Sequence, residues 1–230
     1  GPRSTRPDPH FSSLRVLVQA LVGGLRVLLD HLHVAMVDTS VGRLFAMLHA
    51  CLAQLFVCTL IAITVSCTRG WINGGAVVHD SVRRAGVVCC ALLFIQLGIA
   101  AVMRHSFAGL AIPTFPYSTP DGGLLPDTWN FRIAIHFAHR AMAVVLAGAL
   151  TWFAYKLWID QKTSAGLRVG ALALVGLLTI QIILGAQIIW THRSAATTTG
   201  HVAVGALTLA VTFWLTWVAS RTLIERKHGS

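Results

Sequence analysis

Residues 130–158 read NFRIAIHFAHRAMAVVLAGALTWFAYKLW, an apolar stretch that carries His136, His139 and Arg140 within its first three turns. A helix needs roughly 20 residues to cross a bilayer, so this stretch is long enough to span one. An ionisable side chain inside a membrane helix is costly, and it usually has a partner and a function. Histidine indicates metal binding, and histidines on two facing helices indicate a haem.

The composition of the whole chain is also that of a membrane protein. Of its 230 residues, 55% are hydrophobic and 11% are charged, whereas a soluble domain has about 25% charged residues. We therefore predict an all-α membrane protein with about six transmembrane helices, at residues 14–29, 41–66, 85–104, 131–158, 166–190 and 195–223. Gly23 and Gly24 interrupt the first span, so a re-entrant or interfacial segment is its alternative.

The net charge of +10 comes from basic residues between the spans, where they act as topology signals rather than as a nucleic-acid surface. The positive-inside rule therefore puts both termini in the cytoplasm or in the mitochondrial matrix. The five cysteines have no zinc or haem-attachment spacing, and we expect them to be reduced. The residues that set the orientation are Arg3, Arg6, Arg15, Arg69, Arg83, Arg84, Lys156, Lys162, Arg168, Arg221, Arg226 and Lys227.

The longest connection on the outer side is residues 104–129, RHSFAGLAIPTFPYSTPDGGLLPDTW. Its prolines and glycines exclude a helix through most of its length. Loops this long are often functional lids. An ordinary loop lying on the membrane interface is an equally good interpretation.

An internal repeat sets the domain organisation. Gln19-x-x-x-Gly23 precedes a span that contains His49, and Gln181-x-x-x-Gly185 precedes a span that contains His201. The last four spans then form a complete four-helix bundle, and the first two are the end of a preceding, pseudo-repeated bundle. The predicted domains are a disordered N-terminus at 1–13, a partial N-terminal half at 14–68, a cytoplasmic linker at 69–84, a C-terminal four-helix half at 85–224 and a tail at 225–230.

Three histidines lie at one depth in helices that all enter from the outer side. His49, His139 and His201 each lie about 6–8 residues inside their span, or roughly 9–12 Å at about 1.5 Å per residue. The residue at i+4 shares a face with each histidine, and a small residue there leaves room for a macrocycle. These small residues are Ala53, Ala143 and Gly205. The alternative for any single histidine is a hydrogen bond that only packs helices.

Two imidazoles from facing helices are the expected ligands of a six-coordinate haem in a bundle. His139 and His201 belong to the same four-helix unit, so we predict that they are the axial ligands, with His136 as the alternative to His139. The eight carboxylates lie outside the spans or at their ends, so the sequence shows no carboxylate proton relay. Arginines near the outer interface are candidate partners for haem propionates: Arg140, Arg26 and Arg104.

Several stretches together resemble the haem A synthase family of cytochrome oxidase assembly. They are MLHACLAQLF (47–56), RHSFAGLAIPTFP (104–116), HFAHRAMAVV (136–145), QIILGAQ (181–187) and TTTGHVAVGAL (197–207). The resemblance covers nearly everything from Arg15 to Thr222. It implies two four-helix halves, with haem b held by His139 and His201 in the C-terminal half. It also implies that the substrate, haem O, binds in the N-terminal half, where His49 matches that half's second, catalytic histidine.

The implied reaction oxidises a methyl group of haem O to a formyl group, with electrons passing through the cofactor haem. The chain departs from the family in two ways: two N-terminal helices, with a histidine and an acidic residue, and a frequent cysteine pair are missing. A haem O synthase, or a partner chain that supplies the missing helices, is therefore a candidate partner beside membrane lipid. The alternative function is a cytochrome b-like electron carrier without hydroxylase activity. We expect the bacterial inner membrane, with the mitochondrial inner membrane as the alternative.

Overall fold

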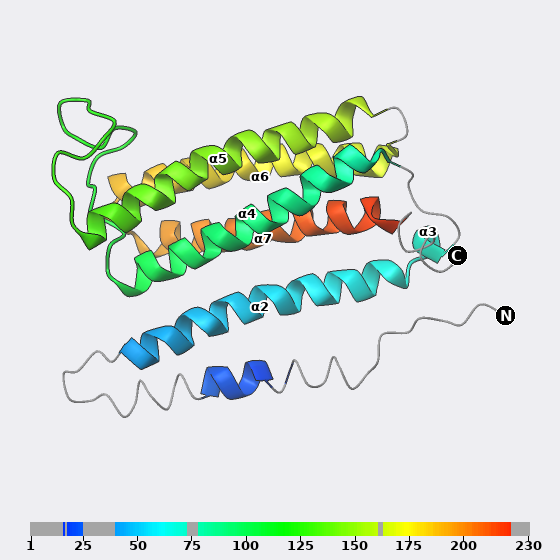
Figure 1. Cartoon of the computed structure of the whole chain (residues 1–230), viewed down its shortest axis with the longest axis horizontal. Coiled ribbons are helices and arrows are strands. Elements are labelled where there is room, and N and C mark those ends of the chain that lie inside the picture. The colour runs from blue at the N-terminus through cyan, green and yellow to red at the C-terminus, as the bar shows by residue number, and fades with distance from the viewer. Residues whose placement is uncertain (1–15, 17, 25–39, 73–77, 161–162, 222–230) are drawn as a thin grey trace. The chain divides into compact units, whose positions relative to one another are not determined.

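The structure, a computed structural model, describes residues 16, 18–24, 40–72, 78–160 and 163–221. Within these residues the chain is helical and has no strand. It divides into two compact units, residues 1–64 and residues 65–230, and each unit is considered by itself (Figure 1).

In the part of the chain that the structure describes, five helices are long and apolar enough to cross a membrane. They are α2 (Ser40–Ser66), α4 (Asp80–His105), α5 (Phe131–Ile159), α6 (Ala165–Trp190) and α7 (Ala195–Ala219). The additional helix α3 (Arg69–Ile72) is a single turn. The predicted all-α, multi-pass membrane protein is thus confirmed. The sixth predicted span, 14–29, lies largely outside the described residues, although 18–24 is helical.

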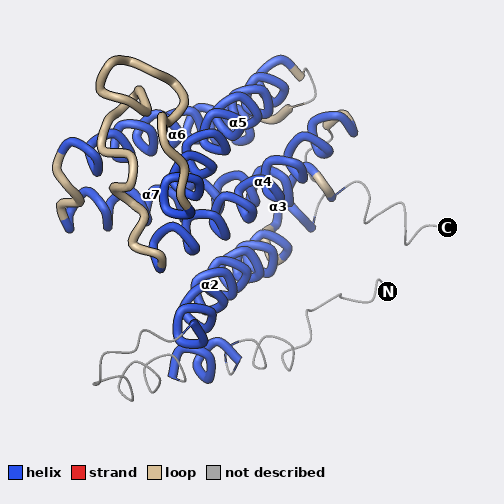
Figure 2. Tube along the Cα trace, turned by 60° about the vertical axis from the view of Figure 1, so that its left-hand side comes forward, coloured by secondary structure: helices blue, strands red, loops and turns tan. Residues whose placement is uncertain are grey.

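Helices α4 to α7 form a four-helix bundle (Figures 1 and 2). Helix α4 packs on α5 and α7, and α6 packs on the same two helices. The chain reverses direction at each connection, so α5 and α7 run parallel and face each other diagonally across the bundle. The connection 106–130 and the turn 191–194 lie at one end, which we call the loop end (Figure 1).

Local sequence explains where two of these helices begin. The Asn130 side chain accepts a hydrogen bond from the Ile133 N–H at 3.0 Å and caps α5, and Ser164 caps α6 in the same way. Helix α4 begins at Asp80, inside the segment that the sequence predicted as a linker. The helix begins before the predicted residue 85 because Val82 is buried in the core of the bundle, and this burial stabilises the additional helical turn.

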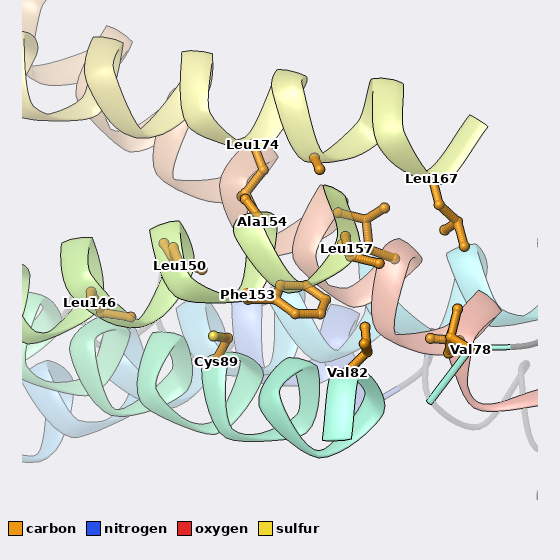
Figure 3. Close-up of a cluster of buried hydrophobic side chains, with 13 residues drawn as sticks. Val78, Val82, Cys89, Leu146, Leu150, Phe153, Ala154, Leu157, Leu167 and Leu174 are labelled. Atoms are coloured by element: carbon orange, nitrogen blue, oxygen red, sulfur yellow. The ribbon is translucent and has the colours of Figure 1, made fainter. Parts of the chain in front are cut away.

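A cluster of buried apolar side chains fills the half of the bundle away from the loop end (Figure 3). Phe153, Leu157 and Leu174 are fully buried in it. Two glycines allow the helices to come this close. A Cβ at Gly86 would clash with Thr216 of α7, and a Cβ at Gly170 would lie 2.6 Å from the Trp214 ring. This half is therefore a rigid base for the residues beyond it.

Hydrogen bonds between His79 and Asp160 join the helix ends at the base of the bundle. The buried Asp160 carboxylate, just after α5, accepts a hydrogen bond from the His79 backbone N–H at 3.0 Å. The same oxygen lies 3.0 Å from Nδ1 of the exposed His79 ring. Replacing Asp160 with Ala should lower the free energy of unfolding by about 1–3 kcal/mol, because two part-buried hydrogen bonds to a carboxylate are lost. Thermal unfolding in detergent measures this loss.

The exposed Asp127 of the loop provides a matched control. Asp127→Ala removes a carboxylate of the same kind from an exposed position, so its unfolding temperature should equal that of the unmodified chain. Equal unfolding temperatures for Asp160→Ala and Asp127→Ala would show that the contact between His79 and Asp160 contributes nothing.

Candidate functional site

His139 and His201 lie on the two diagonal helices of the bundle, α5 and α7. Both lie beyond the apolar core, toward the loop end, and both are half-buried. The structure therefore places this predicted pair on the same side of the core, within one unit.

Gln96 of α4 packs against His139. Its amide nitrogen Nε2 donates to the backbone carbonyl of His139 at 3.1 Å. The same nitrogen lies 3.1 Å from Nδ1 and 3.5 Å from Nε2 of the imidazole. An in-line hydrogen bond to one ring nitrogen would leave the other well out of contact, so the amide lies over the ring face. Gln96 was not predicted from the sequence. Its motif Gln96-x-x-x-Ala100 nevertheless has the same spacing as Gln19-x-x-x-Gly23 and Gln181-x-x-x-Gly185.

Gln181 of α6 packs against His201, and two glycines make room for this contact. The Gln181 amide nitrogen Nε2 lies 3.2 Å from Nε2 of the His201 ring. A Cβ at Gly185 would lie 3.3 Å from Cε1 of His201, and a Cβ at Gly205 would lie 3.1 Å from the Gln181 amide nitrogen. Gly205 was predicted to leave room for a macrocycle beside His201, and in the structure it leaves room for the Gln181 amide.

His136 and Arg140 bind the long connection 106–130. Nδ1 of the buried His136 accepts a hydrogen bond from the Ile112 N–H at 3.1 Å, and its Nε2 lies 3.3 Å from Nε of Arg140. A neutral imidazole has one acceptor nitrogen, so only one of these contacts is a full hydrogen bond. Both ring nitrogens nevertheless lie against protein donors.

The Arg140 guanidinium anchors the same connection through three backbone carbonyls. It donates to Thr114 at 2.7 Å, to Ile112 at 3.0 Å and to Tyr117 at 3.3 Å. It also lies 5.7 Å from the centre of the Phe115 ring, within cation–π range. Because Ile112 is buried, the connection is folded onto the loop end of the bundle.

Further along the connection, a tight turn stabilises its tip. The Ser118 N–H donates to the Gly123 carbonyl at 2.8 Å, and the Gly123 N–H donates to the Thr119 hydroxyl at 2.7 Å. Gly122 adopts a φ of 93°, which suits only glycine. A hydrogen bond between the Thr119 side chain and the exposed Asp121 carboxyl lowers the pKa of that carboxyl below its ordinary value, because the bond favours the charged form.

His49 lies on α2 in the other unit, where it has a similar environment. The Gln19 amide donates to the backbone carbonyl of His49 at 3.3 Å. A Cβ at Gly23 would lie 2.9 Å from Cε1 of the His49 ring, so the glycine makes room for the imidazole. The repeat identified in the sequence thus corresponds to repeated contacts. Arg26 lies outside the described residues.

Several buried polar atoms around His139 and His201 have no hydrogen-bond partner: Nδ1 of His201, Oε1 of Gln96 and Oε1 of Gln181. Buried polar atoms of this kind are rare in folded proteins and call for an explanation. Such atoms beside two half-buried imidazoles mark a place where a further group can bind. The residues present therefore fit a haem held between α5 and α7. In the described part of the chain, no group of three or more His, Cys, Asp or Glu side chains converges on a metal site of another kind.

A sequence profile for the family described as "Cytochrome oxidase assembly protein" matches residues 2–219 of this chain. The chain belongs to the haem A synthase family of cytochrome oxidase assembly proteins. It is 32% identical over 108 residues to a protein named haem A synthase from Shewanella oneidensis. The aligned region covers 46% of this chain and 29% of that relative. The resemblance inferred from the sequence is therefore confirmed at the level of the family.

Membership of the haem A synthase family agrees with a membrane-embedded bundle that carries histidines. The two Gln–His pairs and the connection anchored by Arg140 lie at the same end of the bundle in a protein of this haem-related family.

Proposed function

We propose that this chain is a haem-binding membrane oxidoreductase of the haem A synthase type, with His139 and His201 as the axial ligands of a haem b. The observation that supports it most is the placement of these two half-buried imidazoles on diagonal helices, both beyond the end of the apolar core. Four-helix bundles hold cofactors between facing helices in this way.

The proposed reaction converts a methyl group of haem O to a formyl group. When bound, haem b supplies one-electron chemistry, which no side chain of the bundle offers. The residues of the chain bind and orient that cofactor, and the connection anchored by Arg140 limits the access of water to it. Ala143 is one helical turn from His139, so it leaves space for the macrocycle on the ligand's own face.

His139 rather than His136 is the better ligand on α5. Both ring nitrogens of His136 contact donors of the protein, Ile112 and Arg140, and binding iron would break one of these contacts. The amide of Gln96 instead lies over the face of His139, and it leaves the in-plane lone pair of that ring to an iron. Arg140, and Arg104 at the end of α4, are the proposed partners of the propionates.

The substrate, haem O, would bind in a half to which the unit of residues 1–64 contributes His49. The aligned relative is much longer than this chain, so we propose that further helices, or a partner chain, complete that half. Haem O synthase is the proposed source of the substrate. His49 would contact the substrate and act in catalysis, while His139 and His201 hold the cofactor.

We propose that the loop end faces the outer side of a bacterial inner membrane and that both termini are cytoplasmic. Basic residues support this orientation, because they gather at the base of the bundle. Those within the described residues are Arg69, Arg83, Arg84, Lys156, Arg168 and Arg221, against Arg104, Arg132 and Arg193 at the loop end.

A cytochrome b-like electron carrier is the second candidate function. No carboxylate lies within the interior of any described helix from α2 to α7, and the family resemblance implies an acidic residue in the substrate half. A carrier needs only the His139–His201 site and no substrate half.

Incubation of the purified, haem-loaded protein with haem O and a reducing system separates the two candidates. Chromatography of the extracted haems should reveal hydroxylated haem O or haem A if the chain is a synthase. A normal haem b spectrum without any product would support the carrier, and a preparation that binds no haem would refute both.

A further inference from the structure

We infer that Gln96 and Gln181 are positioning residues, which fix the rotation of the two imidazoles that bind the haem. This inference rests on the proposed function, because it assigns a role around the proposed axial ligands. Neither glutamine touches the iron. Each acts through the histidine that it contacts.

Gln96 is held so that it can act on the ring of His139. Its hydrogen bond to the His139 carbonyl fixes the amide relative to the backbone of α5. That bond also determines which way round the amide lies. If the amide were turned over, its oxygen Oε1 would face the carbonyl oxygen of His139. The amide nitrogen then lies over the imidazole, 3.1 and 3.5 Å from its two nitrogens. A side chain over the ring face opposes rotation of the ring about its bond to Cβ.

Gln181 is held by a different arrangement, in which each helix supplies a side chain and a small residue. Gln181 and Gly185 are one turn apart on α6, and His201 and Gly205 are one turn apart on α7. Gly185 makes room for the imidazole, and Gly205 makes room for the amide. The amide and the imidazole, 3.2 Å apart, therefore interlock. Neither ring nor amide can turn without meeting the opposite helix.

The same spacing recurs in the other unit, which indicates a repeated device rather than one packing contact. Gln19 donates to the His49 carbonyl, as Gln96 does to the His139 carbonyl. Gly23 lies against the His49 ring, as Gly185 does against the His201 ring. Each histidine expected to meet a haem thus has a glutamine on the preceding helix.

Contacts around a ligating histidine orient the ring and tune the metal. The orientation of two axial imidazoles determines the g values of a low-spin ferric haem, and hydrogen bonding around them affects the reduction potential. Removing the amides should therefore change these properties of the bound haem. A purely structural role would leave them unchanged wherever the protein still folds and binds haem.

The test replaces each glutamine with Met, which has similar length and no hydrogen-bonding amide, in the haem-loaded full chain. Gln96→Met and Gln181→Met should weaken haem binding by roughly 10- to 100-fold. They should also shift the g values in electron paramagnetic resonance and the midpoint potential of the haem that remains. Gln181→Leu and Gln96→Leu also remove the amide and suit a membrane helix, so they should change haem binding and g values in the same way as the Met variants.

Gln187→Met is the matched control, because Gln187 is also on α6 and half-buried but has no contact with either histidine. It should leave the spectrum and the potential unchanged. Wild-type-like g values and potential in both Met variants would overturn this inference alone. If a Met variant does not fold, the same result in the Leu variant counts equally. A wild-type chain without haem would overturn the proposed function together with this inference.

Discussion

His201→Ala should abolish the low-spin haem spectrum of the purified protein, and His139→Ala should do the same. Each substitution removes one of two proposed axial ligands, and the remaining histidine cannot hold the iron in a six-coordinate, low-spin state. The Soret and α bands of the reduced protein, measured together with the haem-to-protein ratio, show the loss directly. Far-UV circular dichroism should show that the helices persist, because the apolar core lies in the other half of the bundle.

His192→Asn is the control for these two variants. His192 is exposed on the turn between α6 and α7, where its φ of 49° is one that Asn also tolerates. Its substitution removes an imidazole near the same end without touching the proposed site. A complete low-spin spectrum in the His139→Ala, His201→Ala double variant would be incompatible with the proposed function.

Arg140→Met should release the connection 106–130 from the bundle. The substitution leaves the carbonyls of Ile112, Thr114 and Tyr117 without the charged donor that now binds them. Hydrogen bonds to a charged group contribute roughly 1.5–3 kcal/mol each. The bond to Tyr117 is long and exposed, so the loss of the other two should lower the free energy of unfolding by about 3 kcal/mol or more. Limited chymotrypsin digestion should then cut the connection near the exposed Leu124 and Leu125.

Arg140→Lys tests whether the shape of the guanidinium matters as well as its charge. A lysine keeps the charge but cannot reach three carbonyls with a planar fork, so cleavage should remain fast. Arg132→Met, at the exposed start of α5, should leave cleavage slow. If Arg140→Met resists protease as well as Arg132→Met does, the anchoring role is refuted.

The sequence predicted the membrane helices well, because long apolar segments are a strong signal. It predicted the start of α4 less well, since the residues before 85 are mixed in character. Burial of Val82 and the contact between His79 and Asp160 extend that helix. Such tertiary contacts between residues far apart in the chain have no signature in a local window.

The candidate site could be predicted in part. Depth in the span selected His139 and His201, but it could not separate His139 from His136, because both lie in the first turns of the same helix. The contacts of His136 with Ile112 and Arg140, and the contact of His139 with Gln96, favour His139 in the proposed assignment. The anchoring of Thr114 and Tyr117 by Arg140 was likewise invisible, since backbone carbonyls carry no sequence identity.

The confinement of the apolar core to one half of the bundle has a consequence for biogenesis. Phe153, Leu157 and Leu174 can hold the four helices together before any prosthetic group arrives. Insertion of the polypeptide into the bilayer and acquisition of its prosthetic group can therefore be separate events. Under the proposed function, binding of the haem at the loop end is then a late step in an already assembled protein.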